Sequence, residues 1–306
     1  MEKTLEKTST LRRRKRKDAI FFASLVVLPL AQFILFYICV NFNSILMAFQ
    51  TYNDNAFQFA GFVNFQRFFY ELANMPDIRT MIGNSLIAWA VNLFVGIFLG
   101  MIFSYYIFKK MPAHGIFKVL LFMPSIVSSI VMVMVYRQFV DSALPSIYKA
   151  ITGTARLGLI SDVNTRFGAI LFYNLWVGFG TQILMFVGAM NNISDSVIEA
   201  AKMDGASFFR EFFYIVVPLV YPTFVVFVTV GVVQIFTNQL NLYSFFGTDT
   251  EMRDRTIGYY LYREVQAGTV AGYPYLSAIG ILCTIVAIPV TFLVRFVLNK
   301  LGPAEE

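Results

Sequence analysis

The sequence is poor in charge and in the side chains that most often carry catalysis. Charged residues make up 14% of its 306 residues and hydrophobic residues 58%, whereas soluble domains carry roughly 25% charge and under 50% apolar residues. Cysteine occurs twice and histidine once. Cys39 and Cys283 lie inside apolar runs, and His114 has no ligand-like neighbours. The composition therefore indicates a polytopic membrane protein without a disulfide framework or a metal site.

Motifs for nucleotide binding and for catalysis are also missing. The sequence has no glycine-rich loop ending in Lys-Ser or Lys-Thr, so ATP must bind to a separate chain if it is used. No apolar run offers a His/Glu cluster, a Ser–Lys or Ser–His pair, or two facing aspartates. An intramembrane enzyme is the least supported class, and we predict neither enzyme activity nor a cofactor for this chain.

Positive charge is concentrated near the N-terminus, where residues 12–17 are all Lys or Arg. This run directly precedes an apolar run, so we interpret it as a cytoplasmic topology anchor on anionic lipid and predict no nucleic-acid partner. It alone fixes the predicted orientation, with both ends of the chain in the cytoplasm. The apolar run that follows is too long for a signal-peptide core, and no small-residue cleavage pattern comes after it, so we expect an uncleaved span.

Six apolar runs are long enough to cross roughly 30 Å of hydrocarbon as helices. They are apolar on all faces, which indicates helices and excludes the alternating pattern of a barrel. The predicted fold class is therefore all-α, a polytopic membrane protein with six transmembrane helices. The predicted spans are residues 19–41, 81–108, 119–136, 167–190, 219–238 and 274–294.

A polar segment, residues 194–222, separates the fourth and fifth runs and predicts two short helices at the water boundary. Ser196 followed by Glu199 indicates a capping box for the first helix, and Gly205 is placed to end it in a left-handed conformation. Ser207 can cap the second helix. An apolar stripe then follows at Phe208, Phe212 and Ile215, and Pro218 and Pro222 bend the chain into the next run.

This segment resembles the EAA loop of binding-protein-dependent ABC importer permeases. The matching positions are Glu199, Ala200, Ala201, Asp204, Gly205, Ala206, Phe212, Ile215, Pro218 and Pro222. In that family the loop docks into a groove of a cytoplasmic ATPase subunit. The resemblance therefore implies that ATPase coupling is carried by Glu199, Ala200, Ala201, Asp204, Gly205 and Ala206. The alternative is an ordinary amphipathic cytoplasmic loop, which so many matches at fixed spacing disfavour.

Other stretches resemble the carbohydrate-uptake subclass of these permeases, the maltose and multiple-sugar type. They are residues 61–65 (GFVNF), 118–124 (KVLLFMP), 256–262 (TIGYYLY) and 272–278 (GYPYLSA). The resemblance covers residues 19 to 298 and implies a type I ABC importer permease core. One departure is that Phe246-Gly247-Thr248 replaces the Gly-Gly-Pro expected after the fifth span, which leaves the outer loop and the exact substrate open.

The resemblance implies a domain organisation and a set of partners. A basic N-terminal tail (1–18) precedes a transmembrane permease domain (19–298) that contains the coupling segment (194–217), and a short C-terminal tail (299–306) follows. The implied location is the bacterial plasma membrane. The implied partners are a cytoplasmic ATPase dimer that binds the ATP, a second permease subunit in a heterodimer, an extracytoplasmic solute-binding protein, membrane lipid and a carbohydrate substrate.

Uncharged polar side chains inside the fourth and fifth spans are candidates for holding that substrate. Such residues are costly in a membrane and usually face a cavity or a neighbouring helix. The candidates are Trp176, Gly178, Thr181, Gln234 and Asn238, and the fourth span also contains Asn174 and Gln182. Amides and hydroxyls beside aromatic rings suit a sugar, and the lack of charge argues against an ion or acidic cargo. Close helix packing and hydrogen bonds between helices are the alternative roles.

The leading functional hypothesis is the permease subunit of an ATP-driven sugar importer that works by alternating access. The ATPase dimer would close on ATP and pull the docked helices of residues 194–213, and the spans would rock to open the cavity outward. The alternative is a self-contained secondary transporter or channel for an uncharged solute. That alternative lacks membrane-embedded charges for ion coupling and a visible inverted repeat.

Overall fold

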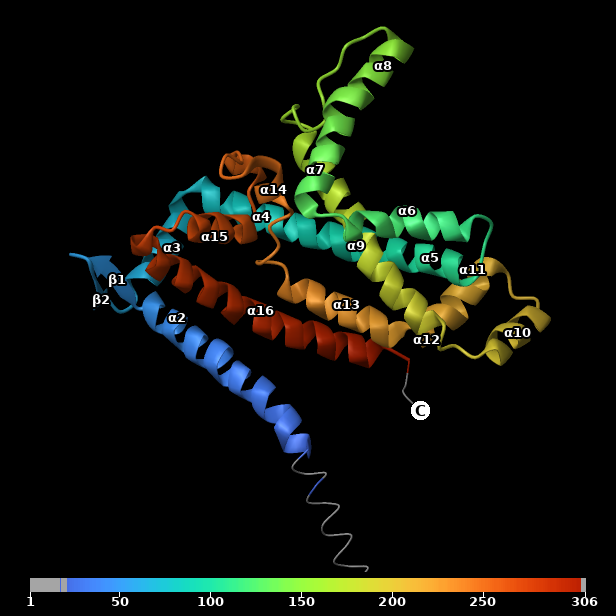
Figure 1. The fold of residues 1–306 in the computed structure, drawn as a ribbon, viewed down its shortest axis with the longest axis horizontal. Coiled ribbons are helices and arrows are strands. Elements are labelled where there is room, and N and C mark those ends of the chain that lie inside the picture. The colour runs from blue at the N-terminus through green and yellow to red at the C-terminus, as the bar shows by residue number, and fades with distance from the viewer. Residues whose placement is uncertain (1–16, 18–20, 304–306) are drawn as a thin grey trace, which may run out of the picture. The chain divides into compact units, whose positions relative to one another are not determined.

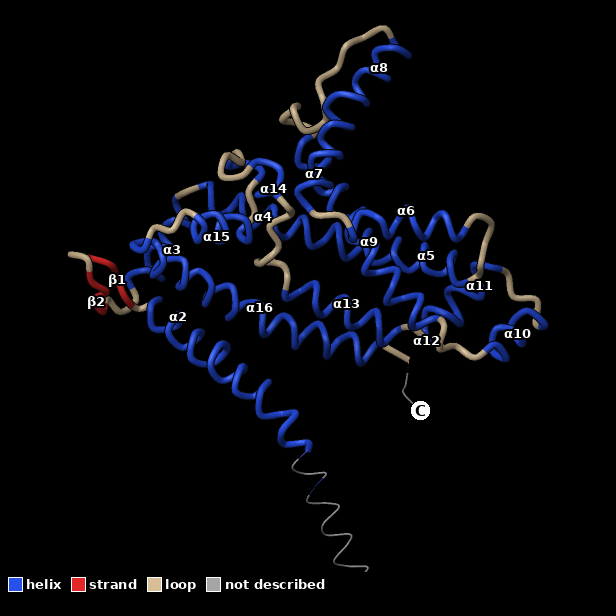
Figure 2. The backbone as a smooth tube through the Cα atoms, in the orientation of Figure 1, coloured by secondary structure: helices blue, strands red, loops and turns tan. Residues whose placement is uncertain are grey.

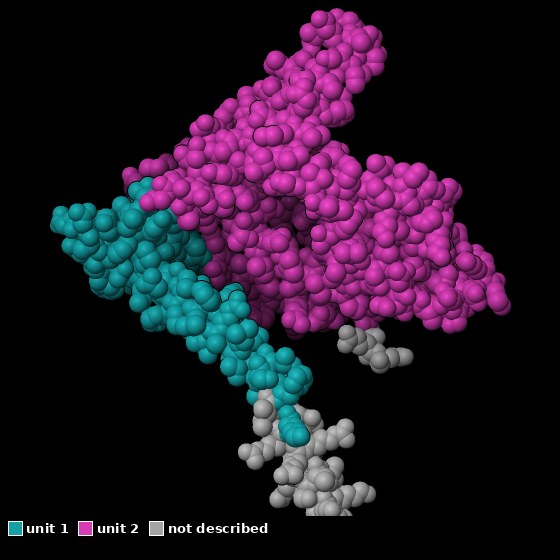
Figure 3. Space-filling model, in the orientation of Figure 1, with its two compact units in different colours: residues 1–68, 269–281 teal, residues 69–268, 282–306 magenta. Residues whose placement is uncertain are grey.

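The computed structural model describes residue 17 and residues 21–303. The predicted N-terminal tail apart from Lys17, the first two residues of the first predicted span, and residues 304–306 of the C-terminal tail lie outside the described residues. The chain forms two compact units, one of residues 1–68 with 269–281 and the other of residues 69–268 with 282–306 (Figure 3). Among the described residues, helices are the main secondary structure of both (Figure 2).

The apolar helices of the described residues agree with a polytopic membrane protein. Five are long and apolar enough to cross a membrane, and two further helices, bent by 70° at a break, make a sixth if the pair counts as one span. The five are Phe21–Ala48, Pro76–Phe108, Ser129–Thr152, Arg166–Met190 and Val270–Leu301, and the bent pair is Phe208–Leu219 with Tyr221–Val233. The prediction of a helical, multi-span fold is thereby confirmed.

The first unit contains a β-hairpin that the sequence analysis did not predict. The elements of this unit are the π-helical stretch η1 (Phe33–Cys39), α2 (Val40–Ala48), β1 (Gln50–Asn53), β2 (Ala56–Phe59), the start of α3 (Val63–Asn74), the 3₁₀ turn η6 (Val270–Gly272) and the start of α16 (Tyr273–Leu301). The hairpin consists of β1 and β2. The strands are antiparallel, with Asn53 opposite Ala56. Asp54 and Asn55 both have positive φ, as a two-residue type I′ turn requires.

Asn64 of the GFVNF stretch fixes α3 to this hairpin. Its side-chain amide donates to the carbonyl oxygens of Ala48 at 2.9 Å and Gln50 at 2.7 Å, and the side chain is buried. Arg67, one turn further along α3, places its guanidinium 4.1 Å from the centre of the Tyr275 ring. The sequence element that resembled sugar permeases therefore has a structural role in this unit.

The second unit holds most of the spans (Figure 1). Its elements are α4 (Pro76–Val91), η2 (Asn92–Gly96), α5 (Ile97–Phe108), α6 (His114–Ile126), α7 (Ser129–Gln138), η3 (Phe139–Ala143), α8 (Leu144–Thr152), α9 (Arg166–Met190), α10 (Asp195–Met203), α11 (Phe208–Glu211), η4 (Phe212–Val216), α12 (Val217–Leu219), α13 (Tyr221–Val233), α14 (Leu242–Phe246), η5 (Met252–Asp254), α15 (Ile257–Gln266) and the rest of α16.

Two apolar cores lie along the two halves of α9, and a smaller one around Phe179 and Ile183 lies between them. One joins its first half to α7, α14 and α15 through the rings of Tyr136, Tyr173 and Phe245. The other joins its second half to α5 and the α11–α13 region. α9 approaches α5 closely at Gly100, where a Cβ would stand 2.4 Å from the side-chain oxygen of Gln182. The amide of Gln182 donates to the Asn92 side-chain oxygen at 3.3 Å, which satisfies part of this buried polar group.

Most predicted spans differ in extent from the helices observed. The first, predicted to end at residue 41, continues to Ala48, and the second, predicted from residue 81, begins at Pro76. The third, predicted as residues 119–136, straddles a break between α6 and α7 at Val127 and Ser128, whose backbones are extended. Pro124 in the last turn of α6 removes one helical hydrogen bond just before this break. The helix of the fifth, predicted to reach residue 238, ends at Val233. Turns follow at residues 234–237, and Leu240 and Asn241 adopt positive φ. The sixth continues to Leu301 and so includes Arg295.

Candidate functional site

The polar segment after α9 forms the two predicted helices, α10 and α11. α10 ends in a Schellman motif: the Gly205 N–H donates to Lys202 O at 3.1 Å and the Ala206 N–H to Ala201 O at 3.0 Å. Gly205 has φ +72°, so the predicted left-handed stop is confirmed. Ser207 caps α11 as predicted, because its hydroxyl oxygen accepts from the Arg210 N–H at 3.4 Å.

The predicted capping box at Ser196 and Glu199 is wrong. Ser194 occupies the N-cap position of α10, with an extended backbone and no side-chain capping bond. Ser196 lies inside the helix, and its hydroxyl is 3.1 Å from that of Ser194. Two serines two residues apart are both plausible caps in sequence, and the backbone selects the earlier one.

One face of α10 is buried and the other is open. Ile198 and Ala201, three residues apart, are buried. Glu199, Ala200 and Met203 lie on the opposite, exposed face, and the Met203 side chain is 88% exposed. Asp204 and Gly205 are exposed and Ala206 is half-buried. The six residues predicted for ATPase coupling therefore form one short protrusion, in which Ala201 faces inward.

The base of this protrusion is anchored to the end of α5. Phe208 and Phe212 pack against the Tyr105 ring, with centroids 4.6 Å and 4.9 Å away. The Tyr105 hydroxyl donates to Phe208 O at 3.3 Å. The Lys109 ammonium donates to both carboxylate oxygens of Glu211, at 2.8 Å and 2.9 Å. Glu211 is buried, so this is a charge-assisted bond shielded from solvent.

The chain after α11 bends as predicted from its two prolines. The π-helical stretch η4 and α12 lead to Val220, where the direction changes by 70° before α13. Pro218 and Pro222 lack the N–H groups that a straight helix would use, and each ring would clash with the carbonyl four residues earlier. The protrusion therefore connects to α13 through this bend.

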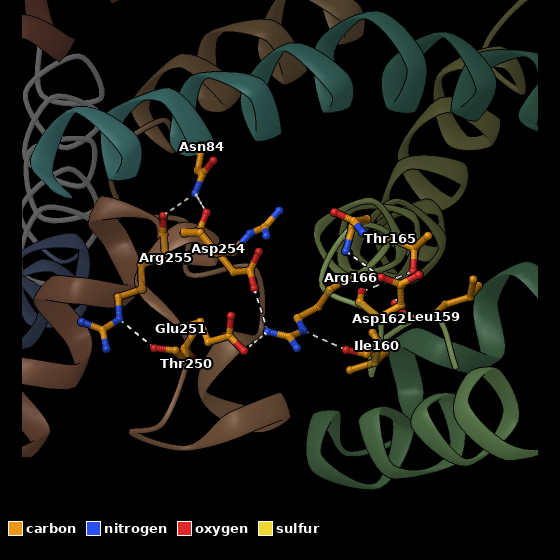
Figure 4. Close-up of polar contacts among 12 residues, drawn as sticks. Asn84, Leu159, Ile160, Asp162, Thr165, Arg166, Thr250, Glu251, Asp254 and Arg255 are labelled. Carbon is orange, nitrogen blue, oxygen red and sulfur yellow. Dashed lines mark hydrogen bonds and ion pairs between the residues drawn. The ribbon is translucent and has the colours of Figure 1, made fainter. Parts of the chain in front are cut away.

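At the opposite end of α9, a polar cluster holds the loop that follows α13 (Figure 4). Arg166 pairs with Asp254 at 3.2 Å and with Glu251 at 2.6 Å, and its Nε donates to Ile160 O at 2.8 Å. Burial raises the pKa of the Asp254 carboxyl, although the Arg166 guanidinium acts in the opposite direction. The Asn84 amide donates to Arg253 O and Arg255 O, at 2.8 Å and 2.9 Å.

The same loop contacts α15 of the TIGYYLY stretch. The Thr256 hydroxyl caps α15 by accepting from the Tyr259 N–H at 3.1 Å, and it donates to Asn238 O at 2.9 Å. Gly258 lies so close to the backbone of Thr237 that a Cβ would stand 2.6 Å from its carbonyl carbon. Gly258 is therefore required for close approach of two backbones.

The predicted cavity residues divide into two groups. Gly178, Thr181 and Gln234 border open space: a Cβ on Gly178 would meet no atom within 4 Å, and Thr181 and Gln234 are exposed. α9 contacts the α13 region at two points. The Asn174 amide donates to Leu240 O at 2.9 Å, and the rings of Phe186 and Phe227 stack. In sequence, Gly178 and Thr181 lie between Asn174 and Phe186, and Gln234 lies between Phe227 and Leu240. Figure 3 shows unit 2 hollowed on the face in view.

Trp176 and Asn238 have structural contacts instead. Trp176 is half-buried and packs against the apolar clusters around Tyr173 and Phe179. The Asn238 side-chain oxygen accepts from the Leu240 N–H at 2.9 Å, which stabilises the loop. α13 ends at Val233, and Gln234 and Asn238 follow it in a further turn in which the Asn238 N–H donates to Gln234 O at 3.1 Å.

Several functional candidates were not identified from sequence. They are Lys109, Glu211, Arg166, Asp254 and Asn84. In sequence, Lys109 and Glu211 resemble ordinary charges at a membrane boundary, because 102 residues separate the two partners of this pair. The one usable signal was Arg166 at the start of an apolar run, where an unpaired charge would be costly.

Comparison with known proteins agrees with this geometry. The family model described as "Binding-protein-dependent transport system inner membrane component" matches residues 92–304. The arabinooligosaccharides transport system permease protein AraP of Bacillus subtilis is 25% identical over 285 residues, which is 92% of this chain and 88% of that protein. AraP of Halalkalibacterium halodurans is 27% identical over 232 residues, 72% of each chain. The maltose/maltodextrin permease MalF of Escherichia coli is 22% identical over 162 residues, 52% of this chain and 32% of MalF.

The fold is also similar to solved structures. A crystal structure of a bacterial ABC transporter involved in the import of the acidic polysaccharide alginate has a chain that superposes with a TM-score of 0.77 at 18% identity, over 96% of this chain and 99% of that one. A chain of the bacterial alginate ABC transporter, in complex with an alginate pentasaccharide-bound periplasmic protein, superposes with a TM-score of 0.78 at 19% identity. The superposition covers 96% of this chain and 99% of that one.

Proposed function

Because this chain belongs to the inner membrane components of binding-protein-dependent transport systems, we propose that it carries a neutral sugar or oligosaccharide received from an extracytoplasmic binding protein. It is the multi-pass permease of an ABC importer and not the ATPase. The names of AraP and MalF, which refer to arabinooligosaccharides and maltodextrin, support a carbohydrate cargo. The open space beside Gly178, Thr181 and Gln234, which are uncharged, supports it too.

The observation that carries the coupling part of the proposal is the open face of α10. Glu199, Ala200 and Met203 are exposed there, next to the Gly205 turn. We propose that this face docks on one subunit of a cytoplasmic ATPase dimer, and that a second permease subunit supplies the other docking face. Both ends of the chain then lie in the cytoplasm. Closure of the ATPases would pull the protrusion and, through Lys109 and the bend at Val220, move α5 and α13.

Transport in a defined system tests this proposal. The permease pair and its ATPase are reconstituted in liposomes, with the binding protein outside and ATP inside. We expect uptake of a labelled neutral oligosaccharide to require both ATP and the binding protein. Uptake rates of an arabinooligosaccharide, a maltodextrin and a uronate oligosaccharide are compared to identify the preferred cargo. Uptake driven by an ion gradient without ATP would contradict the proposal and favour a self-contained secondary transporter.

A further inference from the structure

The end of α13 nearest the bend forms one wall of a groove that is distinct from the coupling face and from the open space beside Gly178. The groove has a volume of about 850 Å³, and the last turns of α16 form its other wall. The two helices run side by side there (Figure 1), and the Tyr221 hydroxyl donates to Leu298 O at 2.7 Å. Its lining residues are Pro218, Leu219, Tyr221, Pro222, Val225, Val226, Thr229, Val230, Arg295, Asn299, Gly302 and Pro303.

This groove is amphipathic. Leu219, Val226 and Val230 give it an apolar side and are each about half exposed. Arg295 is the one charged residue that lines it, and Asn299 lies one turn further along the same face of α16. Among the described residues no carboxylate forms an ion pair with Arg295. A cation next to an apolar wall fits a ligand with a negative head and an apolar tail.

The membrane supplies such a ligand. Anionic phospholipids are concentrated in the cytoplasmic leaflet, and basic pockets between transmembrane helices on that side bind their headgroups. Arg295 lies six residues before Leu301, the last residue of α16. Lys300 lies at the same end of the helix. Pro218 and Leu219 of the groove directly follow the coupling segment in sequence. The inference rests on the proposed function only for placing this end in the cytoplasmic leaflet.

We propose that this groove binds one anionic phospholipid, with its phosphate on Arg295 and Asn299 and an acyl chain along Leu219, Val226 and Val230. The groove includes the bend of the broken span, since Pro218 and Leu219 precede Val220 and Tyr221 and Pro222 follow it. A lipid seated there contacts both arms of the bend and α16. Its binding therefore favours one angle between the coupling segment and α13, and transport becomes sensitive to anionic lipid.

Lipid retention tests the site without requiring transport. The assembled importer is purified from nanodiscs of phosphatidylcholine that contain phosphatidylglycerol, and the retained lipids are counted by native mass spectrometry. We expect Arg295→Gln to retain phosphatidylglycerol about fivefold less than wild type, as the loss of one surface cation implies. Lys300→Gln, on the same helix end but outside the groove, is the matched control and should retain it normally. Equal retention in wild type and Arg295→Gln, or equal loss in both variants, would overturn the site.

Two further arms identify the occupant. Phosphatidylglycerol in the nanodisc should raise the melting temperature of the wild type. Glycerol phosphate added to phosphatidylcholine nanodiscs should not. An equal rise with both would mean that the groove binds a soluble phosphate ester and not a phospholipid. A cysteine at Val226 should not cross-link to the second permease subunit, and efficient cross-linking would assign the groove to that subunit. Failure of uptake alone, with retention as expected, would count against the proposed function and leave the lipid site intact.

Discussion

Lys109 and Glu211, 102 residues apart in the chain, form an ion pair in which the ammonium group contacts both carboxylate oxygens, at 2.8 Å and 2.9 Å. Glu211 is 3% exposed and Lys109 16% exposed. The pair joins the C-cap residue of α5 to the last residue of α11, the helix that follows α10. It therefore couples a membrane span to the segment that we propose to dock on the ATPase.

Breaking this pair should uncouple the importer. Removing one partner of a buried pair costs about 3–5 kcal/mol, so Glu211→Ala should lower the melting temperature of the complex and reduce the stimulation of ATP hydrolysis by loaded binding protein. The exchange Lys109→Glu with Glu211→Lys should restore much of both. Wild-type stability and stimulation in Glu211→Ala would show that the pair has no part in coupling.

The Asp254 carboxyl should make stability depend on acidic pH. Its pKa is raised in the folded protein because burial outweighs the opposing effect of Arg166. The folded state then binds a proton more readily than the unfolded state, so the contribution of this group to stability falls as pH rises from its ordinary pKa of 3.8 towards the folded value.

Asp254→Asn removes that titration and keeps the shape of the side chain. The stability of wild type relative to this variant should therefore decrease as pH rises above about 4, which thermal melts between pH 3.5 and 7 can follow. The slope of this difference, and not its size at one pH, is the informative quantity. A relative stability that increases with pH would mean that the Arg166 ion pair outweighs burial.

Gln234 and Asn238 should respond differently to the same substitution. Gln234 is exposed at the end of α13, so Gln234→Leu should depress uptake while the complex stays assembled. A lost hydrogen bond to a sugar hydroxyl costs about 1–3 kcal/mol, which is roughly five- to 150-fold in affinity. Asn238→Leu should also destabilise the protein, because its side-chain oxygen holds the Leu240 N–H. Val233→Leu, at an exposed apolar neighbour, is the control, and normal uptake in Gln234→Leu would assign Gln234 to packing.

Topology is tested by cysteine labelling in intact cells. Both native cysteines are first replaced, and single cysteines are placed at Asp249 and Lys202, which are exposed in the structure. A membrane-impermeant maleimide should label position 249 and not position 202. Labelling of position 202 from outside would contradict both the orientation and the coupling role.

Local features of the fold were predictable from sequence, and long-range ones were not. Gly205, Ser207 and the Pro218–Pro222 pair act on the backbone within one turn, so the helix stop, the cap and the bend follow from their chemistry. The Asp54-Asn55 turn was missed because the short strands beside it lack a clear alternating pattern.

The candidate site was predictable only in part for the same reason. The coupling residues form one contiguous stretch with a characteristic spacing, whereas the cavity depends on where α13 ends. The loop after that end is held by hydrogen bonds from Asn174 to Leu240 O and from Thr256 to Asn238 O, across 66 and 18 residues of sequence. The Arg166–Asp254 pair spans 88 residues, and sequence pattern alone does not identify such partners.

Gly205 should affect assembly, whereas Glu199 should affect coupling. Gly205 has φ +72° with open space at its Cβ position, so Gly205→Val should act through backbone strain of about 1–2 kcal/mol and misplace the docking face. Gly205→Asn, which tolerates this conformation, is the control and should assemble normally. Glu199→Ala lies on an exposed face and should cost little stability.

The most direct test of the coupling role is ATP hydrolysis stimulated by loaded binding protein, measured together with subunit stoichiometry in membranes. If Glu199 meets a basic group on the ATPase, as the family resemblance implies, Glu199→Ala removes one partner of an interface charge pair. We then expect full assembly with stimulated hydrolysis reduced about tenfold or more. For Gly205→Val we expect fewer ATPase subunits bound to the permease. Full assembly and wild-type stimulated hydrolysis in both variants would contradict the claim that residues 194–217 couple this permease to its ATPase.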